Sequence, residues 1–583
     1  MANKSVFAIF LIIILQIGAE SSLASEALIT GIPNPEFGLN ETTPPRPTSW
    51  PDSPTSNYYF VDNTHPNSTD SFNEFGTPSK PRQTIPDGVL AAGTYIEIHG
   101  GPYTGGYEFR ANGTLLSPVW VTGNSESRPI FTGSLAVTDS TYLIIENLDF
   151  NGGISGAISV SASSGSQTHH VAIRDFAIRN RTWGGNNSAA LGIGAHDNAQ
   201  THDVVISNCL IHDLASEVDW QDGVDRDFHG IAPNVYGRDA TSGVEVSDIW
   251  IIGCEGHHIS GNFVQVVGQA VSNGYAGDIL HHIYVGGNSA YSNRQAGYWT
   301  KTARDVIFSR NLSHSARAYS AGSGDGGGYQ YGPDFVWWIF NEFHNNNFGI
   351  RQSSTPSDLG FQPQVFMVGN LIYNCKRFDT PTKSDAWREG VGISLWHGGT
   401  KRYIVDNTIA NCNTGIISIY DNVGDIQLSG NLIFETADDE PFIDVSHVAR
   451  AGRIQARNNL FYNTGGIELF SWNWAVYTSL SSLEAADQNV AENIVANPDF
   501  FRTNHVASDR DYSLSSSSPA IDQNSTMTPD GTDVYSLFEE RYGINIEVDF
   551  LGNPRTAGSH PDIGAFEFQD FDRPAPPTDL QAE

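Results

Sequence analysis

One lysine is a candidate for chemistry, and it ends a short β-favouring run that starts with glycine. The run is Gly297-Tyr-Trp-Thr-Lys301. A lysine there can supply positive charge for an acidic ligand or, when deprotonated, a base. The surrounding segment is also basic and contains Arg294, Arg304, Arg310 and Arg317, with Asp305 as its acid. On a chain with a formal net charge of −34, this segment predicts a local positive patch for an anionic polymer.

Four later runs also begin with glycine and align with the first: Gly328–Tyr331, Gly349–Gln352, Gly392–His397 and Gly415–Tyr420. Strand side chains alternate between faces, so if the residue after each glycine points inward, the next one points outward. This register predicts one outward column of Trp299, Gln330, Arg351 and Ser394, and a second containing Lys301 and Trp396. Aromatic faces and long polar groups in rows predict a groove for an extended glycan.

Three side chains near these columns are further candidates. Arg351 can grip a carboxylate or sulfate through two parallel hydrogen bonds, and His397 can act as a second acid or base. Tyr331 points inward unless its strand ends there, in which case it is a candidate proton donor. The same alternation predicts that only one of Trp337 and Trp338 points into the core.

An acidic run precedes these strands, Gln221-Asp222-Gly-Val-Asp225-Arg-Asp227-Phe-His229. Three carboxylates this close could hold calcium or supply the acid and base of a hydrolase. The spacing does not match an EF-hand loop.

A degenerate repeat must position these residues. A β-rich run, an asparagine, an apolar pair and a polar turn recur about every 23 to 28 residues in several places, a period typical of solenoids. The asparagines are Asn311, Asn370, Asn407, Asn431 and Asn459, with weaker copies at Asn208 and Asn288. Asparagine tolerates left-handed φ and bonds to neighbouring backbone, so a buried asparagine ladder is expected. We therefore predict an all-β fold, a single-stranded right-handed parallel β-helix with loop excursions.

The chain ends have a different composition. Residues 1–24 have the basic start, apolar run and small residues of a signal peptide, which predicts export, and no other stretch is apolar enough to span a membrane. Residues 25–56 read as a Pro/Thr/Ser-rich linker or arm, residues 57–570 as the β-helix catalytic domain, and residues 571–583 as a linker to a possible further module. The four cysteines are expected to be buried, with a Cys375–Cys412 bridge as an option if those repeats stack.

Residues 57–570 resemble the pectate-lyase-like β-helix superfamily of secreted polysaccharide-degrading enzymes. The opening Gly93–Tyr103 resembles its first coil, and the segments Asp511–Leu514, Ser518–Asp522, Asp549–Arg555 and Pro561–Glu567 resemble its closing part. The resemblance implies fold and export but not the reaction. The run that ends at Lys301 resembles the Gly-aromatic-x-x-Lys strand of β-helix pectate lyases, which implies that Lys301 is the base.

The resemblance of the Lys301 strand to pectate lyases favours a lyase that cleaves an anionic glycan by β-elimination. Lys301 would be the base, Arg351 or calcium would neutralise the substrate carboxylate, and His397 would assist. The expected substrate-binding residues are Trp299, Arg304, Gln330, Tyr331 and Trp396, and the expected calcium ligands are Asp222, Asp225 and Asp227.

Two alternatives remain open. A glycoside hydrolase similar to iota-carrageenase or polygalacturonase needs two carboxylates about 5–10 Å apart, from Glu389 or the Asp222–Asp227 loop. The paired Asp-Asp and Gly-His-Gly motifs of polygalacturonases are missing. A non-catalytic glycan-binding surface would also explain the exposed tryptophans. The acidic chain is expected to avoid nucleic acid and membranes, to bind an anionic polysaccharide and to be a monomer.

Overall fold

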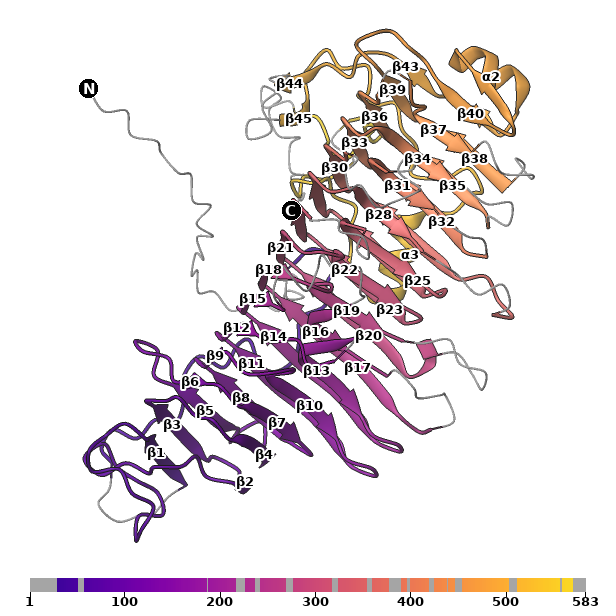
Figure 1. Cartoon of the computed structure of the whole chain (residues 1–583). Helices are drawn as coiled ribbons and strands as arrows, with labels where there is room; N and C mark the ends of the chain where they lie inside the picture. The colour runs from indigo at the N-terminus through magenta and orange to yellow at the C-terminus, as the bar shows by residue number, and fades with distance from the viewer. Residues whose placement is uncertain are drawn as a thin grey trace, which may run out of the picture.

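The chain winds into a long parallel β-helix whose strands form three rows along the molecule (Figure 1). The computed structural model describes residues 29–50, 57–185, 187–215, 226–235, 242–268, 276–316, 323–353, 359–376, 389–395, 399–418, 424–437, 439–445, 453–502, 511–555 and 558–569. The described strand pairs within the three rows are parallel, apart from the terminal hairpin of β40 and β41. The predicted right-handed parallel β-helix is confirmed, in the hand that parallel crossovers almost always take.

Three sheets, called first, second and third here, make up these rows. The first sheet contains β2 (Gly88–Ala91), β4 (Gly106–Asn112), β7 (Ser134–Thr138), β10 (Ile158–Ala162), β13 (Ser188–Ala195), β16 (Phe228–Pro233), β19 (Val264–Val267), β22 (Ala296–Lys301), β25 (Asp325–Gln330), β28 (Phe348–Gln352), β31 (Val391–Leu395), β34 (Thr414–Ser418), β37 (Ile443–Val445), β40 (Phe470–Trp472) and β41 (Ala475–Tyr477). The second sheet contains β1 (Tyr58–Asp62), β3 (Tyr95–His99), β5 (Val119–Gly123), β8 (Thr141–Glu146), β11 (Gln167–Arg174), β14 (Gln200–Ser207), β17 (Glu245–Ile252), β20 (Leu280–Gly286), β23 (Arg304–Ser309), β26 (Asp334–Ile339), β29 (Gln364–Val368), β32 (Lys401–Val405), β35 (Ile426–Ser429), β38 (Ile454–Arg457) and β42 (Val490–Ala491). The third sheet contains β6 (Ile130–Phe131), β9 (Asp149–Asn151), β12 (Ala177–Arg181), β15 (Leu210–Leu214), β18 (Glu255–Ile259), β21 (Ser289–Tyr291), β24 (Leu312–His314), β27 (Glu342–His344), β30 (Leu371–Tyr373), β33 (Thr408–Ala410), β36 (Leu432–Phe434), β39 (Leu460–Tyr462) and β43 (Ile494–Val495).

Few other elements are present in the described residues. They are the 3-10 helix η1 (Ala276–Asp278), the helices α2 (Leu480–Ala486) and α3 (Val534–Tyr542), and the antiparallel pair β44 (Phe500–Arg502) and β45 (Asp511–Leu514). Helix α3 begins after Asp533, whose carboxylate accepts from two backbone amides, and ends at Gly543 with a φ of 69°. Both ends therefore have the residue types that cap helices well.

A ladder of asparagines runs along the core at the turn from the second to the third sheet. From Asn311 onward, each side-chain oxygen accepts from the backbone and side-chain amides of the asparagine in the preceding coil, at 2.9 to 3.2 Å for the Asn288–Asn311 and Asn341–Asn370 steps. The left-handed φ belongs to the residue before the ladder asparagine, for example Arg310 at 54°. The expected ladder is confirmed, but the expectation that the asparagines themselves take left-handed φ is wrong. The ladder residues are Asn288, Asn311, Asn341, Asn370, Asn407, Asn431, Asn459 and Asn493.

Cysteines replace asparagine where the ladder reaches the earlier coils. Cys209 and Cys254 form a disulfide between adjacent coils. Asn208, which the repeat pattern grouped with the ladder, is the left-handed residue before Cys209, with a φ of 51°. The repeats of Cys375 and Cys412 do stack, since the Cys375 backbone amide donates to the Cys412 sulfur at 3.3 Å, but these two thiols are free and buried. The expected burial is confirmed for these two cysteines, and the optional bridge between them is not formed.

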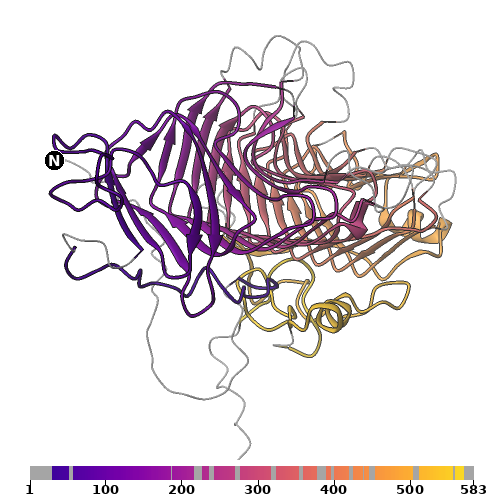
Figure 2. The ribbon, with the colours of Figure 1, turned by 90° about the horizontal axis from the view of Figure 1, so that it is seen from below.

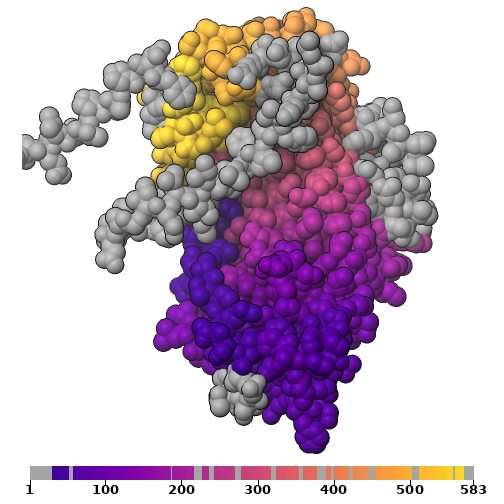
Figure 3. Space-filling view, turned by 90° about the vertical axis from the view of Figure 1, so that its left-hand side faces the viewer, coloured from indigo at the N-terminus to yellow at the C-terminus, as the bar shows by residue number. Residues whose placement is uncertain are grey.

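The outward face of the second sheet is apolar and is covered by both ends of the described chain. The N-terminal arm (residues 29–50) packs Ile32 and Phe37 onto this face, and the C-terminal segment (residues 511–555 and 558–569) packs α3 onto it. Figures 2 and 3 show the indigo arm and the yellow segment on the same side of the coils. The covered outward residues are Tyr95, Trp120, Ile144, Ala172, Val205, Trp250, Tyr284, Ile307, Trp337, Phe366 and Tyr403.

The prediction that only one of Trp337 and Trp338 points into the coil is confirmed, and the cover explains why the other is buried as well. Trp338 points into the coil and stacks on Phe308, and Trp337 points outward, yet both are 0% exposed. The Trp337 ring lies 4.8 Å from the ring of Phe538 in α3. Both tryptophans are therefore buried, because the outer face of this strand is covered and each face packs into its own hydrophobic core.

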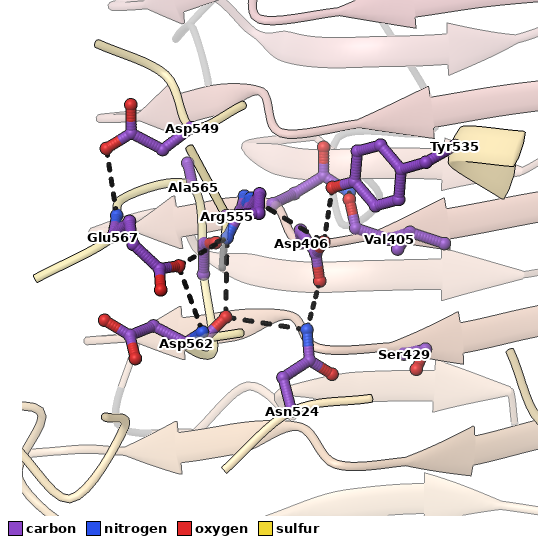
Figure 4. A network of polar contacts seen from close by, with 12 residues as sticks. Val405, Asp406, Ser429, Asn524, Tyr535, Asp549, Arg555, Asp562, Ala565 and Glu567 are labelled. Atoms are coloured by element: carbon purple, nitrogen blue, oxygen red, sulfur yellow. Dashed lines mark hydrogen bonds and ion pairs between the residues drawn. The ribbon is translucent and has the colours of Figure 1, made fainter. Parts of the chain in front are cut away.

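A buried polar network holds the C-terminal segment against the second sheet (Figure 4). Asp406 at the end of β32 accepts hydrogen bonds from Asn524 and Tyr535 at 2.5 Å each, and its carboxylate lies 3.9 Å from the guanidinium of Arg555. That guanidinium also lies 4.0 Å from the carboxylate of Glu567. Several buried carboxylates thus surround one arginine, and burial raises the pKa of Glu567 to about 8.

The predicted segments at the extreme ends lie outside the described residues. These are the signal peptide over 1–24 and the linker over 571–583. Within the described part of the chain, neither helix has the length and hydrophobicity needed to cross a bilayer.

Candidate functional site

A cavity of about 590 Å³ lies on the outward face of the first sheet, over strands β16 to β28. Its lining is mostly polar, which suits a hydroxylated ligand. The lining residues are Asn187, Asp227, Asn234, Asn262, Gln265, Val267, Gly268, Gln295, Trp299, Lys301, Ser323, Asp325, Gln330, Tyr331, Arg351 and Ser353. The structure thus brings together Lys301, Arg351, Trp299, Gln330 and Tyr331, which the sequence had proposed for one groove.

Lys301 lies at the edge where the first-sheet strands end, called here the outgoing edge. It is paired in register with Val267 of β19 and Gln330 of β25. The sequence alignment had placed Gln330 beside Trp299, which is wrong by two residues, because Gly326 rather than Gly328 is in register with Gly297. A slip of two preserves the face of a strand, so Gln330 still points outward.

Tyr331 follows Gln330 directly and has a left-handed φ of 65°. The strand β25 ends at Gln330, so Tyr331 leaves the alternation and lines the cavity. The sequence had made Tyr331 a candidate proton donor on the condition that its strand ends there, and this condition is met.

Trp299 forms the centre of the cavity, in register with Gly328 of β25 and, one strand further, Arg351 of β28. A Cβ atom on Gly328 would lie 2.2 Å from the Trp299 ring, so the ring lies directly on the glycine backbone. The guanidinium of Arg351 lies 5.2 Å from the centre of that ring. This is cation–π distance, and it holds the arginine over the sheet.

Asp325 fixes the guanidinium of Arg351 from the edge where the strands begin, called here the incoming edge. One carboxylate oxygen of Asp325 contacts Arg351 Nε and Nη2 at 2.9 Å each and accepts from the Ser323 hydroxyl at 2.6 Å. The Asp325 side chain is 0% exposed. The arginine is therefore preorganised by a buried ion pair as well as by stacking.

A second carboxylate at the incoming edge is also paired. Asp227 accepts from the guanidinium of Arg294, which is fully buried, and from the amide of Gln295 at 2.5 Å. Asp227 was expected to bind calcium, and its bond to Arg294 instead assigns it a cationic partner within the protein. Asp222 and Asp225, its expected fellow ligands, lie outside the residues that the structure describes.

A neutral histidine lies beneath this edge. His229 is 1% exposed, and its Nδ1 accepts from the backbone amide of Asn262 at 2.9 Å. Burial lowers the pKa of His229 to about 3, and the positive charges of Lys301 and Arg294 act in the same direction. The imidazole is therefore uncharged near neutral pH and adds no positive charge beside Lys301.

The basic run around Lys301 does not form one patch. Arg304 lies on the second sheet, outside the cavity, and contacts Asp278 at 2.7 Å and Asp334 at 3.6 Å. Arg310 bonds to the N-terminal arm through Thr30, at 3.1 Å. The run spans most of one coil, so its side chains point to different faces, and only Lys301 of the described ones lines the cavity. Arg317 is not among the described residues.

Of three other predicted residues, one does not line the cavity and two lie outside the described residues. Glu389, an alternative hydrolase residue, is buried and does not line it. Trp396 and His397 fall in residues 396–398, whose structure is not described. Their roles stay predictions.

The described residues do not fit a calcium site. No group of three or more histidine, cysteine, aspartate or glutamate side chains among them has a geometry that could hold a metal. The remaining expected ligands fall outside the described ranges, so no step below uses calcium.

Sequence reasoning missed Asn262, Gln265 and Asp325. Gln265 shares the column of Trp299, one strand before it. Asp325 begins β25, three residues before the glycine used for the alignment, and is in register with Ala296. Aligning Gly297 with Gly326 instead of Gly328 would have placed Asp325 in the site.

Comparison with known proteins gives likeness in fold only. No family model and no curated protein matches the sequence. Solved structures that align with the chain include pectate lyase Pel9A, at 15% identity with a TM-score of 0.37, covering 88% of this chain and 96% of that one. Another is the GH136 lacto-N-biosidase from Eubacterium ramulus, at 13% identity with a TM-score of 0.39, covering 75% of this chain and 67% of that one. A third is a mannuronic acid specific family 6 lyase from human gut microbiota, at 11% identity with a TM-score of 0.41, covering 70% of this chain and 87% of that one.

Proposed function

We propose that the cavity on the first sheet binds an acidic polysaccharide and cleaves it by β-elimination, with Lys301 as the base. The observation that carries the proposal is the lining itself: Lys301 faces one cavity together with Arg351 and Tyr331. Both carboxylates on the wall are already bonded to arginines, which engages them with partners inside the protein.

The proposed reaction uses each group once. Neutral Lys301 takes the proton from the carbon next to the uronate carboxyl group, and the released electron pair forms a carbon–carbon double bond as the bond to the glycosidic oxygen breaks. Tyr331 donates a proton to that leaving oxygen, and the lysine proton returns to Tyr331 through solvent. Arg351 Nε and Nη2 already contact Asp325 and Ser323, so we assign Nη1 to the substrate carboxylate.

A second candidate is a glycoside hydrolase, because Asp227 and Asp325 line the same cavity. One of them would have to carry a proton to the leaving oxygen and the other would have to activate water or attack the sugar. Both carboxylates are bonded to arginines, and either role would require them to give up those contacts, so the lyase is the better-supported function.

The test is a panel of acidic polysaccharides, followed by the ultraviolet absorbance of the unsaturated product and by new reducing ends, with and without chelator. We expect both signals together, and Lys301→Arg should lower the rate by roughly 10²- to 10⁴-fold, since arginine keeps the charge but cannot act as a base. Lys401→Arg, outside the cavity lining, is the matched control.

Three results would change the assignment. Reducing ends without ultraviolet absorbance, lost in Asp227→Asn, would replace the lyase by the hydrolase. Full activity in Lys301→Arg would reduce Lys301 to a binding charge. Loss of activity with chelator alone would establish the metal that the described residues do not account for.

A further inference from the structure

The two edges of the cavity differ in what they offer a ligand. At the outgoing edge Lys301 is accompanied by Gln330 and Tyr331. At the incoming edge the lining carries Asp227, Asn262 and Asp325. Ala296 and Lys301 are the two ends of β22, five residues or about 16 Å apart at ~3.3 Å per residue. The backbone positions at the two edges are therefore farther apart than one sugar ring spans, and the guanidinium of Arg351 lies at the incoming edge beside Asp325.

The incoming edge holds buried acceptors that need a donor. Asn262 Oδ1 and Asp325 Oδ1 are buried and have no hydrogen-bond partner among the described residues, although both residues line the cavity. Ala296, which is in register with Asp325, is 1% exposed and has only a methyl group. Native structures rarely leave buried acceptors unpaired. A ligand that donates to these two oxygens would form hydrogen bonds that the described protein groups do not supply.

The same edge offers no net positive charge to a second anion. The charges of Asp227 and Arg294 cancel, as do those of Asp325 and Arg351. The acceptor oxygens would repel a sulfate or a second carboxylate placed beside them. Hydroxyl and acetamido N–H groups are neutral donors and fit these oxygens without that cost.

We propose that the incoming edge is a subsite for a neutral sugar with unsubstituted hydroxyl or acetamido donors, formed by Asn262 and Asp325 on either side of Ala296. The substrate is then a glycan in which a uronate, held between Lys301 and Arg351, is followed by a neutral sugar. A polymer with a carboxylate on every sugar, or with sulfate on the neutral sugar, fits less well. This inference rests on the proposed function of the same cavity.

The test measures the affinity of the Lys301→Ala protein, which should bind without cleaving, by titration calorimetry. The probes are unsulfated chondroitin, which alternates a uronate with an acetamido sugar, chondroitin sulfate, and polygalacturonate. We expect unsulfated chondroitin to bind at least about tenfold more tightly than the other two. In the same background, Asn262→Ala and Asp325→Asn should each reduce that preference to about threefold or less. Asp278→Asn, a paired aspartate outside the cavity, should leave it unchanged.

The outcomes separate this inference from the proposed function. Equal or tighter binding of polygalacturonate or of the sulfated polymer, with cleavage by the unmodified protein, overturns the neutral subsite and leaves the lyase intact. Absence of both binding and cleavage for all three probes overturns both. Asp325→Asn could fail to fold because Arg351 loses its partner, and in that case Asn262→Ala still tests the subsite. An unchanged preference for unsulfated chondroitin in Asn262→Ala counts against the subsite.

Discussion

The guanidinium of Arg351 lies 5.2 Å from the centre of the Trp299 ring, and the Cε3–Cζ3 edge of that ring lies over the backbone of Gly328. These three residues occupy successive strands in one register of the first sheet. A side chain at the middle position would separate the outer two. The geometry of the cavity centre thus depends on a residue with no side chain.

Gly328→Ala should disrupt the cavity without touching a reacting group. Its Cβ would lie 2.2 Å from the Trp299 ring and 2.4 Å from the Arg351 carbonyl oxygen, so both residues must shift. We expect kcat/KM to fall by about tenfold or more, because displaced positioning groups are costly in catalysis. Steady-state kinetics, with Trp fluorescence as a report on the ring, measures the effect. Gly192→Ala is the matched control, since it has no atom within 4 Å of the added Cβ. Equal losses in the two variants would argue against this role for Gly328.

Asn370→Ala should destabilise the coil stack. Asn370 is fully buried, accepts from Asn341 at 2.9 Å and donates to the carbonyl of Trp338 at 2.8 Å. Removing the amide leaves several buried partners unpaired, so we expect a loss of about 2–4 kcal/mol in the free energy of unfolding. Denaturant titration measures it. Asn208→Gly is the control, because Asn208 is exposed and has the left-handed φ that glycine adopts at the equivalent position of other coils. It should change the free energy of unfolding by less than about 0.5 kcal/mol. A small effect in Asn370→Ala would show that the ladder is dispensable.

Glu567 should make the docking of the C-terminal segment sensitive to alkaline pH. Burial raises its pKa from 4.5 to about 8, with Asp562 acting in the same direction. The folded chain therefore holds a proton between these values that the unfolded chain has lost, so this contribution to stability is complete below about 4.5 and is lost as the pH rises through 8. The melting temperature should fall between pH 6 and 9, and Glu567→Gln should reduce that fall. Glu492→Gln, an exposed control, should not. An identical fall in Glu567→Gln would exclude this network as its source.

A stack of histidine and tyrosine rings on the third sheet should make the fold sensitive to acid. Burial lowers the pKa of His344 from 6.5 to about 4, with His314 acting in the same direction. The rings of these two lie 4.9 Å apart and nearly parallel. Their neutral form favours folding above about pH 6.5, and this contribution is lost as the pH falls through 4. The stack comprises His212, His257, Tyr291, His314, His344 and Tyr373.

The test of the stack is thermal unfolding between pH 7 and 4. His344→Phe keeps a stacked ring but cannot be protonated, so it should lose less stability on acidification than the unmodified protein. His560→Gln, an exposed histidine outside the stack, is the control. An acid response in His344→Phe as large as in the unmodified protein would assign the response to other groups.

The sequence by itself determined the class of fold and the face on which the candidate residues lie. Lys301, Trp299 and Arg351 were placed outward by strand alternation alone, because the two-residue period of a strand depends only on local backbone geometry. The same local rule kept Gln330 on the right face despite a register error of two. The asparagine pattern likewise predicted a ladder, because each repeat needs the same buried amide.

Only the tertiary structure decided which residues share the cavity and which surfaces are covered. Asp227, Asn262 and Asp325 come from different coils, and their meeting depends on how far each connecting segment extends before the next strand starts. The basic run around Lys301 was local in sequence but lies on several faces, since one coil turns through all of them. The burial of Trp337 under α3 joins residues about 200 positions apart. Contacts of this kind are set by the packing of whole segments, which local residue patterns do not encode.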